Sequence, residues 1–388
     1  MGDVFRKVER KGSSSVKWDY HVQGDQVPFT IADSDYASPK CILNALTKRV
    51  KAGHFGYSKN GDDYLEAIKN WYHKKHACEI QSKWVLPTSN VLTACKIALE
   101  SIGYRGDRVI IMPPVYSSFY NLLENLERKI VCCDLINDNE KYRIDFVKLE
   151  ELFKRGNHIL LLCSPHNPVG RVWRRDELEK LSELCAKYSV TIISDEIHSD
   201  FILGSNKFIS MLEFNEVHRQ LYVLSAPTKT FSLAGLLSAY LIVPDENNRN
   251  SCQKTLTRNC CSVVNILAAT ATKEAYTNPE AFEWVQKQNE HILKNYQTVK
   301  EYLAKYLPEA KLPEQEGTYV LWLNLKCLDK SSAEIVDLLA KGGVLVNSGK
   351  SYGADYDGYI RWCVACSQKQ LKEGLKRFVR VLGAGKKR

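Results

Sequence analysis

Residues 159–170 read ILLLCSPHNPVG, and this stretch indicates the fold of the chain more clearly than any other. It opens with an apolar run without a polar interruption, which is typical of a strand buried on both faces in a parallel sheet. Ser164 and Pro165 then break the run, and Asn167 follows the break. The stretch therefore predicts a buried strand with a polar side chain just beyond its carboxyl end.

Similar apolar runs recur along the chain and alternate with segments of helical spacing. Within 149–153 and 178–185, apolar residues recur as they do on a helix that covers a sheet. This alternation predicts an α/β fold with a mostly parallel central sheet. The other runs that we expect to form its strands are 109–112, 130–133, 190–193, 222–224 and 240–243.

Functional side chains follow four of these predicted strands, namely Asn167, Asp195, Lys229 and Tyr116. Because ligands of open α/β sheets bind outside the carboxyl ends of the strands, we expect all four at one rim. A lysine that forms a Schiff base with pyridoxal phosphate (PLP) requires a carboxylate that keeps the pyridine nitrogen protonated and a donor for the phenolic oxygen. The rim therefore predicts a PLP site in which Lys229 carries the cofactor.

Each residue alone also has an ordinary structural interpretation. Most lysines are solvated surface charges, Asp195 could cap a helix after its strand, and Tyr116 could be a half-buried turn residue. His198 could be a core histidine with satisfied hydrogen bonds, and Tyr57 could be a simple loop residue. These alternatives stay open for single residues, whereas the grouping of several at one rim favours the site.

The C-terminal part of the chain has a different pattern. A long helical pattern covers 282–306, and a strand-like run covers 318–323. The N-terminal residues are too few for a core of their own, so we expect them to fold back onto this part. We therefore predict a large PLP-binding domain at 50–280 and a smaller α+β domain formed by 1–49 and 281–388.

Composition disfavours several classes of function. The chain has 388 residues, 44% of them hydrophobic, so it can bury a large core. Its 54 basic and 45 acidic residues are interspersed, and the basic run of note is 386–388, so we expect no nucleic-acid partner. Residues 1–6 lack the apolar region of a signal peptide, and no run is long enough to predict a membrane span. Thirteen cysteines without regular spacing favour a cytoplasmic protein over a disulfide framework, and we expect no metal site.

Several motifs give the chain a resemblance to a known family. SPHNPVGRVW at 164–173 and DEIH at 195–198 are specific to one subgroup, whereas NPxG alone would indicate only the superfamily. The other stretches that carry the resemblance are KWD at 17–19, IADSDY at 31–36, FGY at 55–57, KTFSLAGL at 229–236, GTY at 317–319 and GYIR at 358–361. Over nearly its full length the chain resembles the fold-type I PLP enzymes of the class I/II aminotransferase superfamily. Among these it is most similar to the cystathionine β-lyases of the MalY/PatB type.

The resemblance implies a role for each residue of the rim. Lys229 would form the Schiff base and act as the catalytic base, with a pKa lowered by burial. Asp195 would pair with the pyridine nitrogen, and Asn167 would donate to the phenolic oxygen, near which His198 would also lie. Tyr116 would stack on the pyridine face and take part in catalysis.

The phosphate of the cofactor is expected at a turn that opens a helix. By resemblance Ser89, Asn90 and Val91 surround it, with backbone amides and the positive helix end as donors. The hydroxyl of Thr228 would add a further contact. Tyr57 would reach the site from a second subunit as a catalytic residue, which implies a homodimer with shared active sites.

The resemblance assigns substrate binding to Arg361 and Asp33. A guanidinium fork matches a carboxylate, so Arg361 would clamp the α-carboxylate of an amino-acid substrate. These assignments leave the substrate preference open, because the chain departs from the family pattern. The departures are Ser34, Ser89, Ser232 and Cys363.

The reaction implied by the resemblance is β-elimination from a cysteine S-conjugate, such as cystathionine or cystine, to a thiol, pyruvate and ammonia. An aminotransferase is the main alternative, because it would use the same residues to remove the α-proton. A second alternative is a regulatory or binding homologue that has lost catalysis. The presence of Lys229, Asp195, Asn167 and Arg361 disfavours it, because a binding module needs no electron sink.

Overall fold

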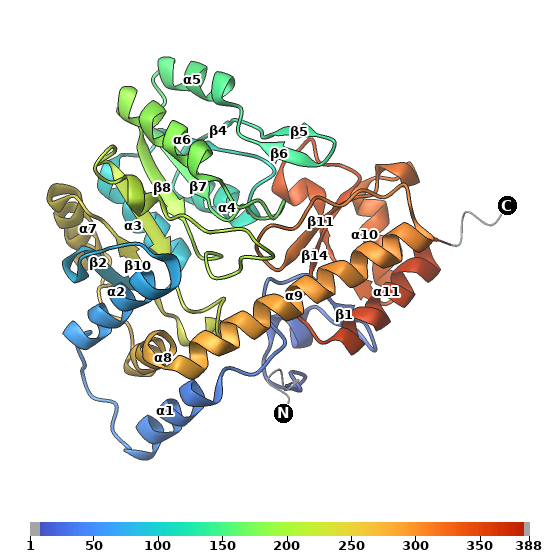
Figure 1. Cartoon of the computed structure of the whole chain (residues 1–388), viewed down its shortest axis with the longest axis horizontal. Helices are drawn as coiled ribbons and strands as arrows, with labels where there is room; N and C mark the ends of the chain where they lie inside the picture. Colours follow the sequence, from blue (N-terminus) through green and yellow to red (C-terminus); the bar gives the residue numbers. More distant parts are fainter. Residues whose placement is uncertain (1–7, 384–388) are drawn as a thin grey trace.

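The computed structural model describes residues 8–383. The start of the chain at 1–6 and the basic run at 386–388, both noted in the sequence, lie outside these residues. Figure 1 shows a larger part, a sheet with helices on both sides, and beside it a smaller part in orange and red built mainly from the C-terminal third. The long helix α9 (Pro279–Tyr306) extends along both parts.

The larger part is built around a seven-stranded sheet with the strand order β2-β10-β9-β8-β7-β3-β4. Neighbouring strands are parallel except at β10, which is antiparallel to both β2 and β9. The predicted α/β class with a mostly parallel sheet is confirmed. The antiparallel direction of β10 was not predicted, because an apolar run does not reveal the direction of its strand. The strands are β2 (Val85–Thr88), β3 (Arg108–Ile111), β4 (Lys129–Cys132), β7 (Ile159–Cys163), β8 (Thr191–Asp195), β9 (Leu221–Ser225) and β10 (Ala239–Ile242).

Helices cover both faces of this sheet, as its apolar strands require. Successive strand residues point to opposite faces, so Ile110 and Leu160 join one apolar cluster while Val109 and Leu161 join another. Helix α3 (Val91–Ile102) packs on the second face against β8, β9 and β10. The other helices of this part are α2 (Asp62–His76), α4 (Ser117–Asn125), α5 (Phe146–Lys154), α6 (Arg175–Lys187), α7 (Glu246–Arg258) and α8 (Ile266–Thr277).

The smaller part is a three-stranded antiparallel sheet, β11-β14-β13, covered by helices. It has an apolar cluster of its own, to which Ile335, Trp362 and Leu371 belong. A hairpin of the larger part, β5 (Ile136–Asp138) and β6 (Lys141–Arg143), reaches this sheet, where the Trp322 indole donates to the Tyr142 hydroxyl at 3.2 Å. The elements of the smaller part are α10 (Ser332–Lys341), α11 (Gln368–Leu382), β11 (Val320–Asn324), β12 (Val344–Leu345), β13 (Asn347–Ser348) and β14 (Tyr359–Cys363).

The N-terminal segment contacts both parts in turn. Strand β1 (Val27–Pro28) pairs with β12, so the segment begins on the smaller part. Ala32 still belongs to the apolar cluster of that part, but Tyr36 belongs to that of the larger part. Helix α1 (Lys40–Lys51) then packs against α8, with Ile42 buried in the larger cluster. The packing therefore changes before residue 49, and the domain boundaries predicted from the sequence stay a prediction.

Within residues 8–383, no helix combines the length and the apolar composition that crossing a membrane requires.

Candidate active site

A cavity of about 210 Å³ opens at the carboxyl edge of the large sheet. All nine residues that the sequence assigned to the cofactor line it, although they come from segments far apart in the chain. These residues are Ser89, Asn90, Val91, Tyr116, Asn167, Asp195, His198, Thr228 and Lys229. The remaining lining residues are Ala32, Leu92, Cys163, Ile197 and Ala234.

The parallel strands explain why these side chains meet. β7, β8 and β9 end side by side, and the segments that carry Asn167, Asp195 and Lys229 leave the sheet at the same edge. Asp195 is itself the last residue of β8, where it pairs with Cys163, and does not lie in the following loop as the apolar run suggested. It is therefore held by the sheet and buried.

Lys229 lies next to a backbone carbonyl from the N-terminal segment. Its amine nitrogen Nζ donates a hydrogen bond of 2.6 Å to the oxygen of Ala32. The pKa of Lys229 lies below its ordinary value, because burial disfavours the charged amine and Arg361 repels it, although Asp33 and Asp195 act in the opposite direction. A lowered pKa is what a lysine needs if it is to be a nucleophile and a base near neutral pH.

Asp195 is a buried carboxylate with few partners of its own. One oxygen accepts a hydrogen bond of 3.1 Å from the amide of Ile197. Burial raises the pKa of Asp195 to about 6, against the opposing effects of that amide and of the positive charge of Lys229. A cation beside this carboxylate, such as a protonated ring nitrogen, would stabilise its ionised form.

Asn167 and His198 offer hydrogen-bonding atoms that the protein does not use. In the part of the chain that the structure describes, Asn167 Oδ1 and His198 Nδ1 are buried and have no hydrogen-bond partner. Burial and the charges of Lys229 and Arg361 lower the pKa of His198 to about 3, so its imidazole is neutral. Because buried polar atoms are rarely left unpaired, these atoms fit a ligand with polar ring substituents.

One end of the cavity is the start of helix α3. Asn90 caps this helix, and its Oδ1 accepts a hydrogen bond of 2.9 Å from the amide of Thr93. The hydroxyl of Ser89 donates to that of Thr93 at 3.3 Å, and Thr228 lines the same cavity. A helix start with hydroxyl groups around it favours a phosphate. These residues therefore fit the phosphate group of PLP, in agreement with the sequence.

Arg361 lies on β14 of the smaller part and is buried, but it does not line the cavity. Its Nη2 donates to the carbonyl of Thr30 at 2.5 Å, and its guanidinium carbon lies 5.1 Å from the ring centre of Tyr352. Its Nε finds no hydrogen-bond partner among residues 8–383. A donor is therefore left for a carboxylate, and Arg361 is close enough to Lys229 and His198 to shift both their pKa values.

Asp33 and Tyr57 lie apart from the other predicted residues. Asp33 does not line the cavity; its carboxylate pairs with Arg10 at 2.6 Å, although its charge still raises the pKa of Lys229 against the stronger effect of burial. Tyr57 is fully exposed in the loop between α1 and α2 and does not reach the cavity of its own chain. Its assigned role requires a second subunit.

Sequence reasoning missed two groups beside Lys229. The carbonyl of Ala32 accepts from Lys229 and also from the hydroxyl of Tyr319, at 3.0 Å. Ala32 and Tyr319 stand in two of the stretches that carry the family resemblance, IADSDY and GTY, which were the available signal. A role for a backbone oxygen could not be read from residue type, because every residue carries one.

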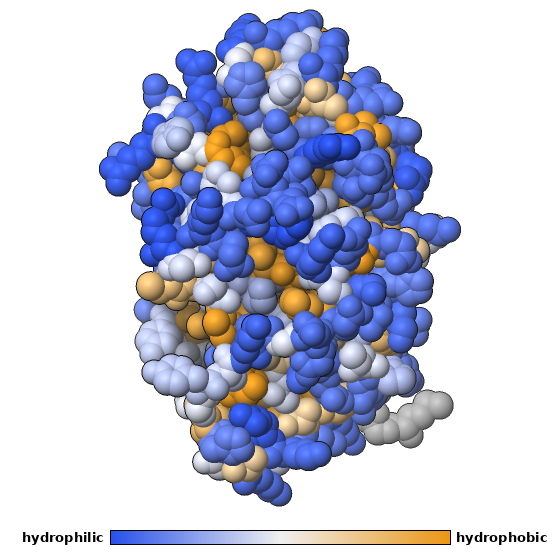
Figure 2. Space-filling model, turned by 90° about the vertical axis from the view of Figure 1, so that its left-hand side faces the viewer, coloured by the Kyte–Doolittle hydropathy of each residue, from blue (hydrophilic) through white to orange (hydrophobic). Residues whose placement is uncertain are grey.

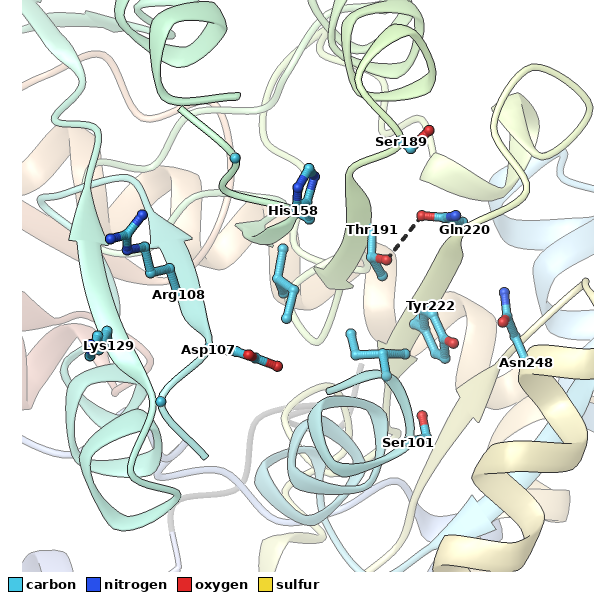
Figure 3. Close-up of a pocket in the computed structure, with 14 residues that line it drawn as sticks. Ser101, Asp107, Arg108, Lys129, His158, Ser189, Thr191, Gln220, Tyr222 and Asn248 are labelled. Atoms are coloured by element: carbon cyan, nitrogen blue, oxygen red, sulfur yellow. Dashed lines mark hydrogen bonds between the residues drawn. The ribbon is translucent and has the colours of Figure 1, made fainter. Parts of the chain in front are cut away.

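A second hollow, of about 650 Å³, lies at the opposite edge of the sheet, where the strands begin (Figure 3). Asp107, Arg108 and Lys129 line it from the starts of β3 and β4. Across it, the hydroxyl of Thr191 donates to the side chain of Gln220 at 3.2 Å. No residue assigned to the site from sequence lines this hollow, and α/β sheets bind ligands at the other edge. Across residues 8–383 no group of three or more side chains is arranged to hold a metal ion.

Comparison with known proteins gives the family of the chain. Residues 24–378 match the family of class I and II aminotransferases, and the chain belongs to this family. It is 33% identical to cystathionine β-lyase PatB of Bacillus subtilis (strain 168) over 96% of the chain and 98% of that protein. It is 30% identical to protein MalY of Escherichia coli (strain K12), over 99% of the chain and 100% of MalY.

A solved structure shows the same fold. The crystal structure of cystalysin from Treponema denticola, which contains a pyridoxal 5′-phosphate cofactor, superimposes with a TM-score of 0.94. The two proteins share 30% sequence identity, and the match covers 100% of both chains. The fold-type I resemblance inferred from the motifs is confirmed.

Proposed function

We propose that this protein is a PLP-dependent carbon–sulfur β-lyase that acts on cysteine S-conjugates such as cystathionine or cystine. One observation carries the proposal: Lys229, Asp195 and Asn167 line one cavity in a chain that matches PatB over nearly its full length. The reaction converts the conjugate and water into a thiol, pyruvate and ammonia.

The residues of the cavity would divide the work among them. Asp195 would hold the ring nitrogen, Asn167 and His198 the ring oxygen, and the start of α3 the phosphate. Tyr116, half-buried at the start of α4, would cover the ring face. PLP, when bound, supplies an electron sink for the charge that develops on the substrate α-carbon.

Two basic side chains would act on the substrate. Arg361 would donate a hydrogen bond from Nε, which no described residue occupies, to the substrate α-carboxylate, and this contact would orient the α-carbon toward the ring. Lys229, with its lowered pKa, would remove the α-proton. Arg361 is buried and Lys229 is half-buried at the cavity wall, so few water molecules compete with the substrate for them.

An aminotransferase is the second candidate, because the family that the chain matches is described by that activity. Both reactions begin with removal of the α-proton and use the same residues, so the geometry of the cavity does not separate them. They differ in their co-substrates: a lyase needs no keto acid to turn over, whereas a transaminase does.

A pyruvate assay tests the proposal. We expect the protein loaded with PLP to release pyruvate from L-cystathionine or L-cystine without an added keto acid, and Lys229→Ala to abolish both this activity and the visible absorption of the bound cofactor. Lys187→Ala, on the exposed end of α6, is the matched control and leaves both unchanged. Turnover that depends on a keto acid would overturn the lyase in favour of the transaminase.

We also propose a homodimer in which Tyr57 completes the site of the partner. Apolar side chains are exposed along α1 and the loop that follows it, including Leu43, Val50, Phe55 and Tyr57. Figure 2 faces the side on which this loop lies in Figure 1 and shows hydrophobic residues interrupting a hydrophilic surface. Exposed apolar groups of this kind mark sites of association.

We infer further that the protein works in the cytoplasm. None of its thirteen cysteines forms a disulfide, and most are buried. Thiols behave in this way in reducing compartments, where they act as small apolar core residues.

A further inference from the structure

Two residues from sequence motifs of the N-terminal segment have no part in the proposed reaction, yet the structure brings them together. Lys17, from KWD, forms an ion pair of 2.8 Å with Asp35, from IADSDY. The exposed fractions of the two side chains are 1% and 2%. Burial is the largest single influence on the pKa of Lys17 and lowers it. The charge and hydrogen bond of Asp35, together with Cys363 and Cys366, act in the opposite direction and leave the pKa above its ordinary value. A fully enclosed ion pair is costly to desolvate, so its presence calls for a reason.

Asp35 links three segments of the chain through short hydrogen bonds. Besides Lys17, its carboxylate accepts from the indole of Trp18 at 2.8 Å and from the amide of Gln370, on α11, at 2.9 Å. Its own backbone amide donates to the carbonyl of Ala365 at 3.0 Å. This carboxylate therefore fastens the N-terminal segment to the smaller part of the protein, beyond the point where β1 pairs with β12.

The stretch 30–35, which we call the carbonyl strap, passes from this ion pair to the active site. Lys17 Nζ also donates to the carbonyl of Asp33 at 2.9 Å, one residue beyond Ala32. The carbonyl of Ala32 accepts from Lys229 at 2.6 Å, and that of Thr30 accepts from Arg361 at 2.5 Å. The two basic groups of the proposed reaction thus donate to carbonyls of the same short stretch.

We propose that Lys17 and Asp35 are positioning residues, whose buried ion pair holds the carbonyl strap against Lys229 and Arg361. A carbonyl can orient an amine only if its own backbone is fixed, and an ion pair with further hydrogen bonds supplies that rigidity. The strap would set where the amine of Lys229 rests when it is not bonded to the cofactor. This inference rests on the role of Lys229 in the proposed function.

The strap also encloses Lys229, because Ala32 is part of the cavity wall. If the strap were released, water would reach the amine and reduce the effect of burial, which is the main cause of its low pKa. The loss of the ion pair should therefore appear as a change in the titration of Lys229. Lys17 and Lys229 are linked through the strap, because they donate to the carbonyls of the adjacent residues Asp33 and Ala32.

The experiment measures that titration in full-length protein stripped of cofactor. Trace acetic anhydride labels neutral amines, and mass spectrometry gives the labelling of Lys229 as a function of pH. We expect Lys17→Met to raise the pKa of Lys229 by about one pH unit toward that of an ordinary lysine. Reconstituted with PLP, the same variant should lose more in kcat than in KM, because the base is misplaced.

Two controls separate positioning from simple destabilisation. Leu339→Ala, in the core of the smaller part, should lower the melting temperature without moving the titration of Lys229. Lys341→Met removes an exposed ion pair with Asp337 and should change neither quantity. If Lys17→Met unfolds, the uncharged pair Lys17→Gln/Asp35→Asn gives the same measurement with less desolvation cost.

A melting temperature lowered as in Leu339→Ala, with Lys229 titrating as in the wild type, would overturn the inference. Labelling needs neither cofactor nor turnover, so the result is independent of the lyase assay. Wild-type protein that releases no pyruvate would refute the proposed function and leave the link between the strap and Lys229 to be decided by the titration.

Discussion

At the scale of single residues, the behaviour of Lys229 depends on charges of opposite sign around one amine. Burial and Arg361 lower its pKa, whereas Asp33, Cys363 and Asp195 raise it. The net effect is a lowered pKa, so burial outweighs the nearby acids. The same balance appears at Asp195, where burial outweighs the positive charge of Lys229 and raises the pKa to about 6.

Asp33→Asn tests this balance. The substitution removes a negative charge near Lys229, so the pKa of Lys229 should fall further, by up to about one pH unit. The sign is opposite to that expected for Lys17→Met, and labelling of the cofactor-free protein measures both. Asp134→Asn, in an ion pair remote from the cavity, is the control. An unchanged titration would mean that the charge of Asp33 does not reach the amine.

Glu196, next to Asp195, makes the stability of the protein depend on pH. Burial raises its pKa to about 8, even though Ser194, Ser210 and the amide of Met211 donate to it. Between about pH 4.5 and 8 the folded protein keeps a proton that the unfolded chain loses, so the free energy of unfolding falls as the pH rises.

Glu196→Gln removes this titration. The variant should therefore gain stability relative to the wild type between pH 5 and pH 8, by about 1 kcal/mol or more. Urea denaturation at the two pH values measures the difference. If variant and wild type differ in the free energy of unfolding by the same amount at pH 5 and pH 8, Glu196 is ionised in the folded protein at both.

At the scale of elements, helix α3 connects stability to phosphate binding through its cap. Asn90→Ala removes the hydrogen bond to the amide of Thr93 and should cost about 1 kcal/mol of stability. Because Asn90 also lines the cavity, PLP affinity should fall by more than this loss of stability explains. Equilibrium dialysis of PLP and urea denaturation measure the two effects.

Asn278→Ala is the matched control for this element. Asn278 caps α9 in the same way, through the amide of Glu280, but does not line the cavity. It should cost similar stability and leave PLP affinity unchanged. Equal losses of affinity in the two variants would mean that the start of α3 does not hold the phosphate.

At the scale of the whole molecule, the proposed dimer predicts that inactive variants complement each other. Lys229→Ala and Tyr57→Ala homodimers should each be inactive or nearly so. After subunit exchange, mixed dimers contain one site with both residues intact, and activity should rise toward about one quarter of the wild-type value. Sedimentation velocity should show a dimer in every sample. No recovery in exchanged dimers would show that Tyr57 does not act across the interface.

Much of the fold and site was accessible from local pattern. Apolar runs located six of the seven strands of the large sheet to within one or two residues, because burial on both faces leaves a continuous signal. Strand β2 (Val85–Thr88) was not predicted. The residues Asn167, Asp195 and Lys229 could be assigned to one rim because parallel strands share an edge. The helix predicted to open at the turn of Ser89, Asn90 and Val91 is α3, which spans Val91–Ile102.

The chain alone determined which residue types follow which buried strands, and with them the family and the identity of the cofactor site. Only the tertiary structure decided that β10 runs antiparallel, that α1 packs on the larger part, and that Lys17 meets Asp35 beneath the carbonyls that receive Lys229 and Arg361. The physical reason is the distance along the chain over which each signal acts. Periodicity and motif spacing report burial and chemistry within one segment. Partners distant in the chain, and backbone oxygens that every residue shares, are selected by packing.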